Sequence, residues 1–207
     1  MHIPDGFLAP TITLPAYAVA APLWIWAARK HFGPSHADAL PAVGALTAVA
    51  FVLQTIMIPL PGGTSTHLVG ASLLALLRGP LVAFVCESLV LLLQALFFGA
   101  GGITVLGANA LAMGLFGPLL AWLCFQPLRR RAPNLGAFLA AYLGLQVSSL
   151  TVALILGLQH HLDPAQLPTP LPVALAAMML PSLTVTGLIE GLYTLFAWRV
   201  LSRGRKA

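Results

Sequence analysis

Charged residues are scarce in this sequence, and acidic residues are the scarcest. Only 7% of the 207 residues are charged, with five Asp or Glu against ten Lys or Arg. A soluble globular protein normally has about 25% charged residues. The hydrophobic fraction is 59% and the mean hydropathy is +0.94. The composition therefore excludes a soluble globule and indicates an integral membrane protein surrounded by lipid.

Cysteine is nearly absent too. Cys86 and Cys124 both fall inside apolar stretches, so we expect packing residues and neither a disulfide nor a pair of metal ligands. The pI near 9.9 is not accompanied by a polar basic face, which excludes a nucleic-acid partner. No G-x-x-x-x-G-K-[ST] phosphate loop occurs, so any ATP would be used by another chain.

Long apolar segments make up most of the sequence. A helix of about 20 residues crosses a bilayer, and 207 residues leave no room for a separate soluble domain. We expect a single transmembrane domain over residues 1–207 and an all-α bundle of seven transmembrane helices. The expected segments are residues 9–28, 40–60, 67–77, 80–98, 107–125, 136–158 and 172–198.

The basic residues predict the topology. They follow the first, third, fifth and seventh segments: Arg29, Lys30, Arg78, Arg129, Arg130, Arg131, Arg199, Arg203, Arg205 and Lys206. Seven crossings put all of them on one face, which the positive-inside rule makes cytoplasmic, whereas six crossings would divide them. The C-terminus is then cytoplasmic and the N-terminus is outside. Because the N-terminal tail holds Asp5 and no basic residue, we expect a retained helix and no cleaved signal peptide.

The segment at residues 67–77 is short for a membrane helix. Eleven residues rise about 16 Å, roughly half of a ~30 Å hydrocarbon core. The glycine-rich stretch 61–66 must then dip inward, and non-helical backbone at that depth is tolerated only in a packed or cavity-lining setting. His67 is expected at the start of the short helix, facing an outward-opening cavity.

The opening Met1-His2 pair is a candidate chelating group on that same external side. The Met1 amine, the His2 amide nitrogen and the His2 imidazole can close two fused chelate rings, and His67 can add a fourth nitrogen. Four nitrogens suit a tetragonal or square-planar site and favour Ni²⁺ or Cu²⁺. The alternatives are a hydrogen-bonded core histidine at 67 and a solvated tail histidine at 2.

Several stretches resemble one known family. The opening MHIPDGFL, PGGTSTHLVG, LLLQALFFGAGGITVLGAN and the late IEGLYT are similar to the CbiM/NikM family, the substrate-capture (S) components of cobalt/nickel energy-coupling-factor transporters. The resemblance covers nearly the whole chain. It implies a seven-helix protein whose N-terminus folds into the bundle and holds the metal through Met1, His2 and His67. The sequence favours nickel slightly, because MHIPDG and PGGT-x-x-H look more like nickel-type members.

The resemblance also implies partners and a location. These are a transmembrane scaffold (T) subunit, two cytoplasmic ATPase subunits and, as a further option, a small accessory membrane subunit. The location is the cell membrane of a prokaryote. The bound substrate would be Ni²⁺ or Co²⁺, with no catalytic cofactor. This sequence departs from frequent family residues at Thr66, Ala100 and Ala112, which concerns loop ordering and not the proposed ligands.

Other polar residues have more ordinary interpretations. Thr64, Ser65 and Asn109 are candidates to orient His67 or hold the tail, or are plain turn and capping residues. Glu87 and Glu190 are predicted in the inner half of their helices, as structural hydrogen-bonding groups or on a release path. His160, His161 and Asp163 are expected in a solvated external loop. His31 and His36 are expected in a cytoplasmic linker.

Three functions compete. The first is a non-catalytic metal-capture subunit of an ATP-driven transporter. The second is a stand-alone metal carrier or channel, which would favour charged residues spread along a pathway. The third is an intramembrane metalloenzyme, which would need a metal-bound water and a nearby base. The one-sided set of candidate ligands favours the first.

Overall fold

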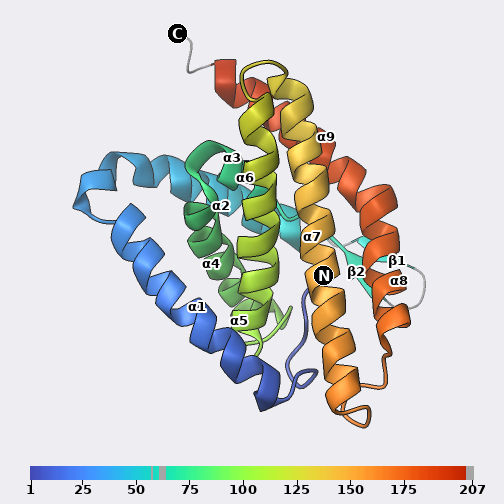
Figure 1. Cartoon of the computed structure of the whole chain (residues 1–207). Helices are drawn as coiled ribbons and strands as arrows, with labels where there is room; N and C mark the ends of the chain where they lie inside the picture. Colours follow the sequence, from blue (N-terminus) through green and yellow to red (C-terminus); the bar gives the residue numbers. More distant parts are fainter. Residues whose placement is uncertain (57, 61–63, 204–207) are drawn as a thin grey trace.

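The computed structural model describes residues 1–56, 58–60 and 64–203, with side chains described outside 57–66 and 203. These residues form a helical bundle with one short hairpin (Figure 1). In chain order the elements are α1 (Pro10–His31), η1 (Pro34–Ala39), α2 (Leu40–Thr55), β1 (Ile58–Leu60), β2 (Thr64–Thr66), α3 (Ala71–Arg78), α4 (Pro80–Phe98), α5 (Leu106–Asn109), η2 (Ala110–Phe116), α6 (Gly117–Leu128), α7 (Pro133–Leu162), α8 (Leu171–Pro181), η3 (Ser182–Thr186) and α9 (Gly187–Arg203).

Two of the long helices are built from several of these elements. α5, η2 and α6 run on as one helix, as do α8, η3 and α9, and η2 and η3 are π-helical segments. Within the described residues, six helices are long and apolar enough to cross a membrane, and α3 is the seventh helix. The predicted all-α, seven-helix membrane bundle is confirmed.

Local sequence explains several helix boundaries. Pro10, Pro80 and Pro133 are the first residues of α1, α4 and α7, where proline's missing N–H costs nothing. Arg29 and Lys30 lie in the last turn of α1, where positive charge complements the helix dipole. These signals place the helix ends before any tertiary contact is considered.

Two expected segments are wrong in detail around the short third helix. α2 ends at Thr55 and not at residue 60, because Ile58–Leu60 pairs antiparallel with Thr64–Thr66, with Pro59 opposite Ser65. α3 begins at Ala71, so His67 lies four residues before the helix and not at its start. The helix cannot begin earlier because Gly70 adopts φ +74°, and a side chain there would press on Ala50.

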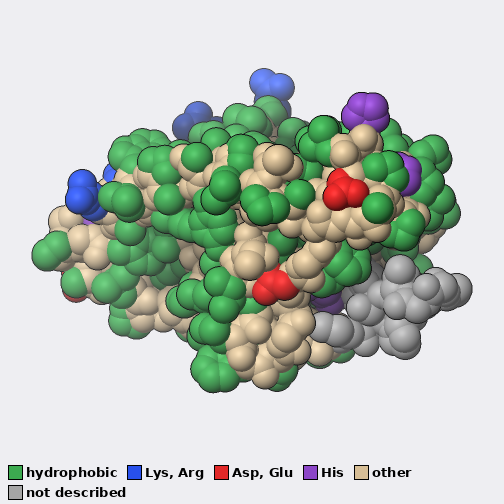
Figure 2. Space-filling view, turned by 90° about the horizontal axis from the view of Figure 1, so that it is seen from below, with side chains coloured by type: hydrophobic (Ala, Val, Ile, Leu, Met, Phe, Trp, Pro, Cys, Tyr) green, Lys and Arg blue, Asp and Glu red, His purple; other side chains and the backbone are tan. Residues whose placement is uncertain are grey.

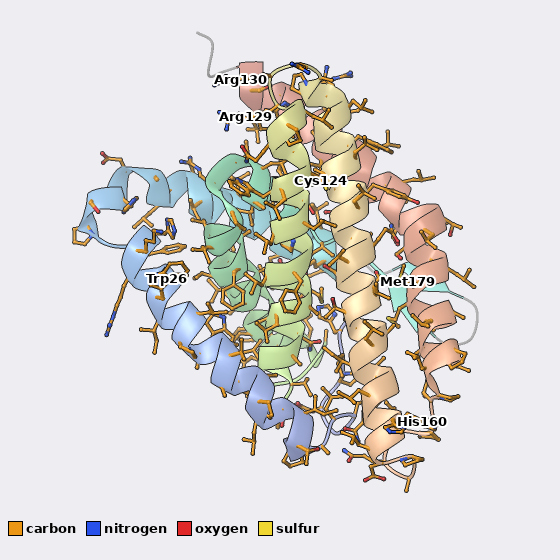
Figure 3. All side chains as sticks on the ribbon, viewed as in Figure 1. Trp26, Cys124, Arg129, Arg130, His160 and Met179 are labelled. Atoms are coloured by element: carbon orange, nitrogen blue, oxygen red, sulfur yellow. The ribbon has the colours of Figure 1, made fainter. Side chains whose placement is uncertain are left out.

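α7 lies at the centre of the bundle, packed against α6, α8 and α9 (Figure 1). Figure 3 shows Arg129 and Arg130 at the end of the bundle that carries the C-terminus, with His160 at the opposite end. Seen from that opposite end, the surface in Figure 2 is mostly hydrophobic or neutral, with isolated acidic and histidine side chains and a few basic side chains at its edge. The basic end of the bundle is thus defined, while the direction in which it faces across the membrane stays a prediction.

Candidate metal site

The N-terminal tail runs into the bundle, and the N-terminus lies about halfway along it (Figure 1). Met1 is 9% exposed and Ile3 is 1% exposed, whereas Pro4 and Asp5 are exposed. The Ser149 hydroxyl of α7 donates a hydrogen bond to the Met1 sulfur at 2.9 Å. The tail is therefore a packed part of the core.

Asn109 holds the tail by a two-point amide contact. The Ile3 N–H donates to Asn109 Oδ1 and Asn109 Nδ2 donates to the Ile3 carbonyl, each at 3.0 Å, and Asn109 is 1% exposed. This pairing satisfies both backbone groups of Ile3, one residue beyond His2. The sequence-based expectation that Asn109 orders the tail agrees with these bonds.

Further contacts anchor the tail where it leaves the core. The Asp5 carboxylate accepts hydrogen bonds from the backbone N–H groups of Ile103 and Thr104 and from the Thr104 hydroxyl. Gln166 donates to the Gly6 carbonyl at 3.0 Å. Asp5 thus ties the tail to the α4–α5 loop, and Gln166 ties it to the α7–α8 loop.

His67 is buried, and its tautomer follows from its partner. Nδ1 lies 2.9 Å from the Leu68 carbonyl oxygen, which only accepts hydrogen bonds, so Nδ1 carries the proton. Nε2 then carries a lone pair and lies 3.4 Å from the Met1 amine nitrogen. A histidine whose Nδ1–H is held by a carbonyl, with the Nε2 lone pair turned to the amine, is arranged as metal ligands usually are.

His2 stacks on His67. The ring centroids are 4.6 Å apart and the ring planes differ by 17°. Part of the His2 residue is exposed, but its Nε2 atom is buried and has no hydrogen-bond partner among the described residues. The structure therefore brings together Met1, His2 and His67, the three predicted metal-site residues.

Burial keeps these nitrogens neutral. It lowers the pKa of the Met1 amine from 8.0 to about 5 and that of His67 to about 3, where the nearby amine lowers it further. The His2 pKa is lowered as well, first by burial and then by His67 and the amine. Near neutral pH all three groups present lone pairs and no positive charge repels a cation.

The spacing of the amine and His67 fits a shared metal ion. Metal–nitrogen bonds of about 2.0 Å place neighbouring ligands in a square about 2.8 Å apart and opposite ligands about 4 Å apart. The observed 3.4 Å lies between these values. No group of three His, Cys, Asp or Glu side chains forms a metal cluster within the described residues. An amine and a backbone amide can complete a site that such side chains alone do not.

Carboxylates hold the loop that carries His67. The two Glu190 oxygens accept the Val69 and Gly70 N–H groups, each at 2.9 Å. Gln54 Nε2 donates to the Val69 carbonyl at 2.9 Å and to both Glu87 oxygens at 2.8 and 3.0 Å. Both glutamates are 0% exposed: Glu190 bonds the backbone that follows His67, and Glu87 bonds the Gln54 amide, which in turn holds Val69.

The other polar residues named in the sequence analysis contribute less to the candidate site. Thr64 and Ser65 lie in β2, and their side chains fall outside the described residues. His160 is hydrogen-bonded to the Leu167 carbonyl, in the α7–α8 region and away from His67. Cys86 and Cys124 are free thiols, as expected.

Sequence reasoning missed Gln54, Gln94 and Ser149. Glutamine inside an apolar segment was the available signal for the first two, since polar side chains in membrane helices are rarely idle.

Comparison with known proteins identifies the family of this chain. The family model for the cobalt uptake substrate-specific transmembrane region, CbiM, matches residues 2–207. The chain belongs to the CbiM family. Proteins similar to it are named for nickel or cobalt transport, and its six long apolar helices make this chain a multi-pass membrane protein.

Relatives within and around the CbiM family differ in their named metal. The chain is 39% identical to the fused nickel transport protein NikMN of Rhodobacter capsulatus, over 96% of this chain and 61% of the relative. It is 36% identical to the probable fused nickel transport protein LarMN of Lactiplantibacillus plantarum, over 98% and 65%. A cobalt transport protein CbiM of Roseiflexus sp. is 42% identical over 69% of this chain and 59% of that protein. The chain thus spans about two thirds or less of these relatives.

Solved structures agree with the CbiM assignment. A crystal structure of a truncated transition metal transporter superposes with a TM-score of 0.90 at 34% identity, covering 99% of both chains. A second transition metal transporter gives a TM-score of 0.91 at 33% identity, covering 100% of this chain and 95% of the other. The fold described above is therefore one that metal transporters use.

Proposed function

We propose that this chain is the metal-capture subunit of an ATP-driven energy-coupling-factor transporter and that its substrate is Ni²⁺ or Co²⁺. The Met1 amine, the His2 amide and imidazole nitrogens and His67 Nε2 bind the ion. One observation carries the proposal: a buried, neutral amine faces the lone pair of a histidine whose other nitrogen is already held.

Nickel is the favoured substrate. Four nitrogens in one plane match the tetragonal geometry that Ni²⁺ accepts readily, while Zn²⁺ prefers a tetrahedron and Mg²⁺ prefers oxygen ligands. The first two relatives named above are fused nickel transport proteins, although others are named for cobalt. Cobalt is the second candidate, and it would use the same nitrogens.

The partners follow from the same proposal. A scaffold membrane subunit and two cytoplasmic ATPases would drive inward release, with the metal site facing outward and the basic end facing the cytoplasm. The fused relatives are longer than this chain, which supports an accessory partner corresponding to their extra length. The chain itself would be non-catalytic, because the proposed ligands fill the plane of the metal with protein nitrogens.

The N-terminal amine offers a direct test. Adding one glycine before Met1 turns that amine into an amide and moves the new amine one residue away. We expect Ni²⁺ affinity, measured by isothermal titration calorimetry on purified protein, to fall at least about 100-fold. The control is the same glycine added after Ala207. Equal binding by all three proteins would show that the amine is not a ligand.

ATP dependence separates the capture subunit from a stand-alone carrier. Cells that express this chain with its transporter partners should lose Ni²⁺ uptake when the ATPases are made inactive, while binding to the purified chain persists. Uptake that continues with inactive ATPases would instead support the carrier.

A further inference from the structure

Three buried polar atoms have no hydrogen-bond partner among the described residues around the metal site: His2 Nε2, Gln54 Oε1 and Gln94 Oε1. Buried polar atoms in proteins almost always have a partner, so each exception calls for an explanation. Hydrogen bonding from both glutamine side chains raises the pKa of His2, so both lie near its imidazole, although neither oxygen forms a direct hydrogen bond with Nε2 in this structure. The three exceptions therefore form a single cluster.

The orientation of Gln54 is set by the rest of its amide. Gln54 Nε2 is occupied by the Val69 carbonyl and the Glu87 carboxylate. Its Oε1 is thereby the end left for His2. Gln94, on α4, is 2% exposed. The two acceptors come from two helices, α2 and α4, and meet at one imidazole.

The two amide oxygens determine which His2 nitrogen carries the proton, because Nε2 is the buried ring nitrogen that lacks a partner. An amide oxygen only accepts, so its partner must be an N–H. Neutral imidazole has one N–H, and placing it on Nε2 leaves the lone pair on Nδ1. Nδ1 is also the nitrogen that closes a six-membered chelate ring with the amide nitrogen of the same residue, because Nε2 lies on the far side of the ring.

We propose that Gln54 and Gln94 are positioning residues that hold the His2 imidazole as its Nε2–H tautomer and present Nδ1 to the metal. This inference rests on the proposed metal site. His67 is held the opposite way, with its proton on Nδ1 and Nε2 free. The two histidines thus present different nitrogens to one ion, each through its own acceptor.

The α4–α5 loop lies beside the same side chain. Gly101 adopts φ +81°, and a Cβ built on it would lie 3.5 Å from His2 Cβ and 3.7 Å from His2 Cδ2. These are ordinary van der Waals distances, so a side chain at position 101 would touch the His2 side chain.

The tautomer can be read without any metal. Nitrogen NMR of metal-free protein labelled with ¹⁵N-histidine distinguishes a protonated from an unprotonated ring nitrogen, and the His2→Ala difference spectrum assigns the His2 signals. We expect wild-type His2 to carry its proton on Nε2. In the double variant Gln54→Leu/Gln94→Leu we expect a mixture of tautomers, and each single variant should shift the Nε2 resonance. A wild-type proton on Nδ1, or an unchanged double variant, would overturn the inference.

Nickel titration of the same proteins gives the functional readout. Removing an outer partner of a metal-binding histidine typically costs 10- to 100-fold in affinity, and we expect a loss of that size in the double variant. Gln94→Glu keeps an acceptor oxygen and should restore most of the affinity lost in Gln94→Leu. Gln146→Leu, a buried glutamine bonded instead to Ser182 and Tyr142, is the matched control.

Failure of the inference and failure of the proposed site give different results. If the tautomer is as proposed but wild-type protein does not bind Ni²⁺, the metal site is wrong and the positioning of His2 stands. If wild-type protein binds Ni²⁺ and the double variant binds equally well with the same tautomer, the positioning role is wrong.

Discussion

Two polar clusters lie at opposite ends of the loop formed by residues 67–70, and they differ in how far their polar atoms are already engaged in hydrogen bonds. The nitrogen cluster, Met1, His2 and His67, leaves lone pairs free. The carboxylate cluster, Gln54, Glu87 and Glu190, commits its glutamate oxygens to the loop backbone and to one amide. A buried acidic side chain is therefore no guide to the cation site here. The neutral nitrogens are the available ligands, and the carboxylates support the loop that presents one of them.

The largest effect on Ni²⁺ affinity should come from His67→Ala, in the nitrogen cluster. It removes the only side-chain nitrogen that the 67–70 loop contributes, and we expect Ni²⁺ affinity to fall at least about 100-fold. The midpoint of thermal unfolding of the metal-free protein should change little by comparison. Titration calorimetry with His161→Ala as control, an exposed histidine on the α7–α8 side, checks this. Retained affinity in His67→Ala would place the metal elsewhere.

A smaller loss is expected from Asn109→Ala, which loosens the nitrogen cluster without touching a ligand. Both hydrogen bonds to Ile3 disappear, so the tail loses its two-point anchor next to His2. We expect a 10- to 100-fold decrease in Ni²⁺ affinity. Asn134→Ala, at the exposed start of α7, is the control. If both variants bind like wild type, the tail does not depend on Asn109.

In the carboxylate cluster, Glu190→Gln should lower the thermal stability of the fold more than the affinity for Ni²⁺. An amide keeps one acceptor oxygen but places an NH₂ group against a backbone N–H, leaving a buried donor unpaired. Such a defect costs about 1–3 kcal/mol, which thermal unfolding in detergent would detect. We expect Ni²⁺ affinity to fall less than about 10-fold. A loss as large as that of His67→Ala would make Glu190 part of the metal site and remove the distinction between the clusters.

The smallest expected effect is the number of protons that the protein releases when Ni²⁺ binds. Burial lowers the pKa of the Met1 amine to about 5 and that of His67 to about 3, so both are already neutral at pH 7. Binding of Ni²⁺ should then release about one proton, from the His2 amide, as calorimetry in buffers of different ionisation enthalpy measures. Release of two or more protons would mean that the amine is protonated in the folded protein, and no release would exclude the amide as a ligand.

The same pKa shifts fix the sign of a stability effect. The amine binds fewer protons in the folded protein than in the unfolded chain, so unfolding becomes easier as pH falls from about 8 towards 5.

The sequence predicted the class of protein, the seven helices and the meeting of His2 with His67. Composition and apolar run length decide the first two, because lipid imposes them on every spanning segment. The meeting of the histidines followed from the short third segment and the basic residues, which put both on one side. The resemblance of MHIPDGFL and PGGTSTHLVG to the family supported the same set of residues.

Tertiary structure decided what the sequence could not. The start of α3 depended on the left-handed conformation of Gly70 against Ala50, a contact between segments about twenty residues apart. Gln54 and Gln94 lie in helices that are apolar nearly all round, where periodicity does not tell which face turns inward. Their amide orientations became interpretable only once Glu87, Val69 and His2 were placed around them.

Nickel X-ray absorption of the loaded wild-type protein tests the central claim most directly. The Met1, His2 and His67 site predicts four nitrogen neighbours in a square plane, with no sulfur and no carboxylate oxygen in the first coordination sphere. A six-coordinate spectrum dominated by oxygen neighbours would contradict the nitrogen cluster as the metal site.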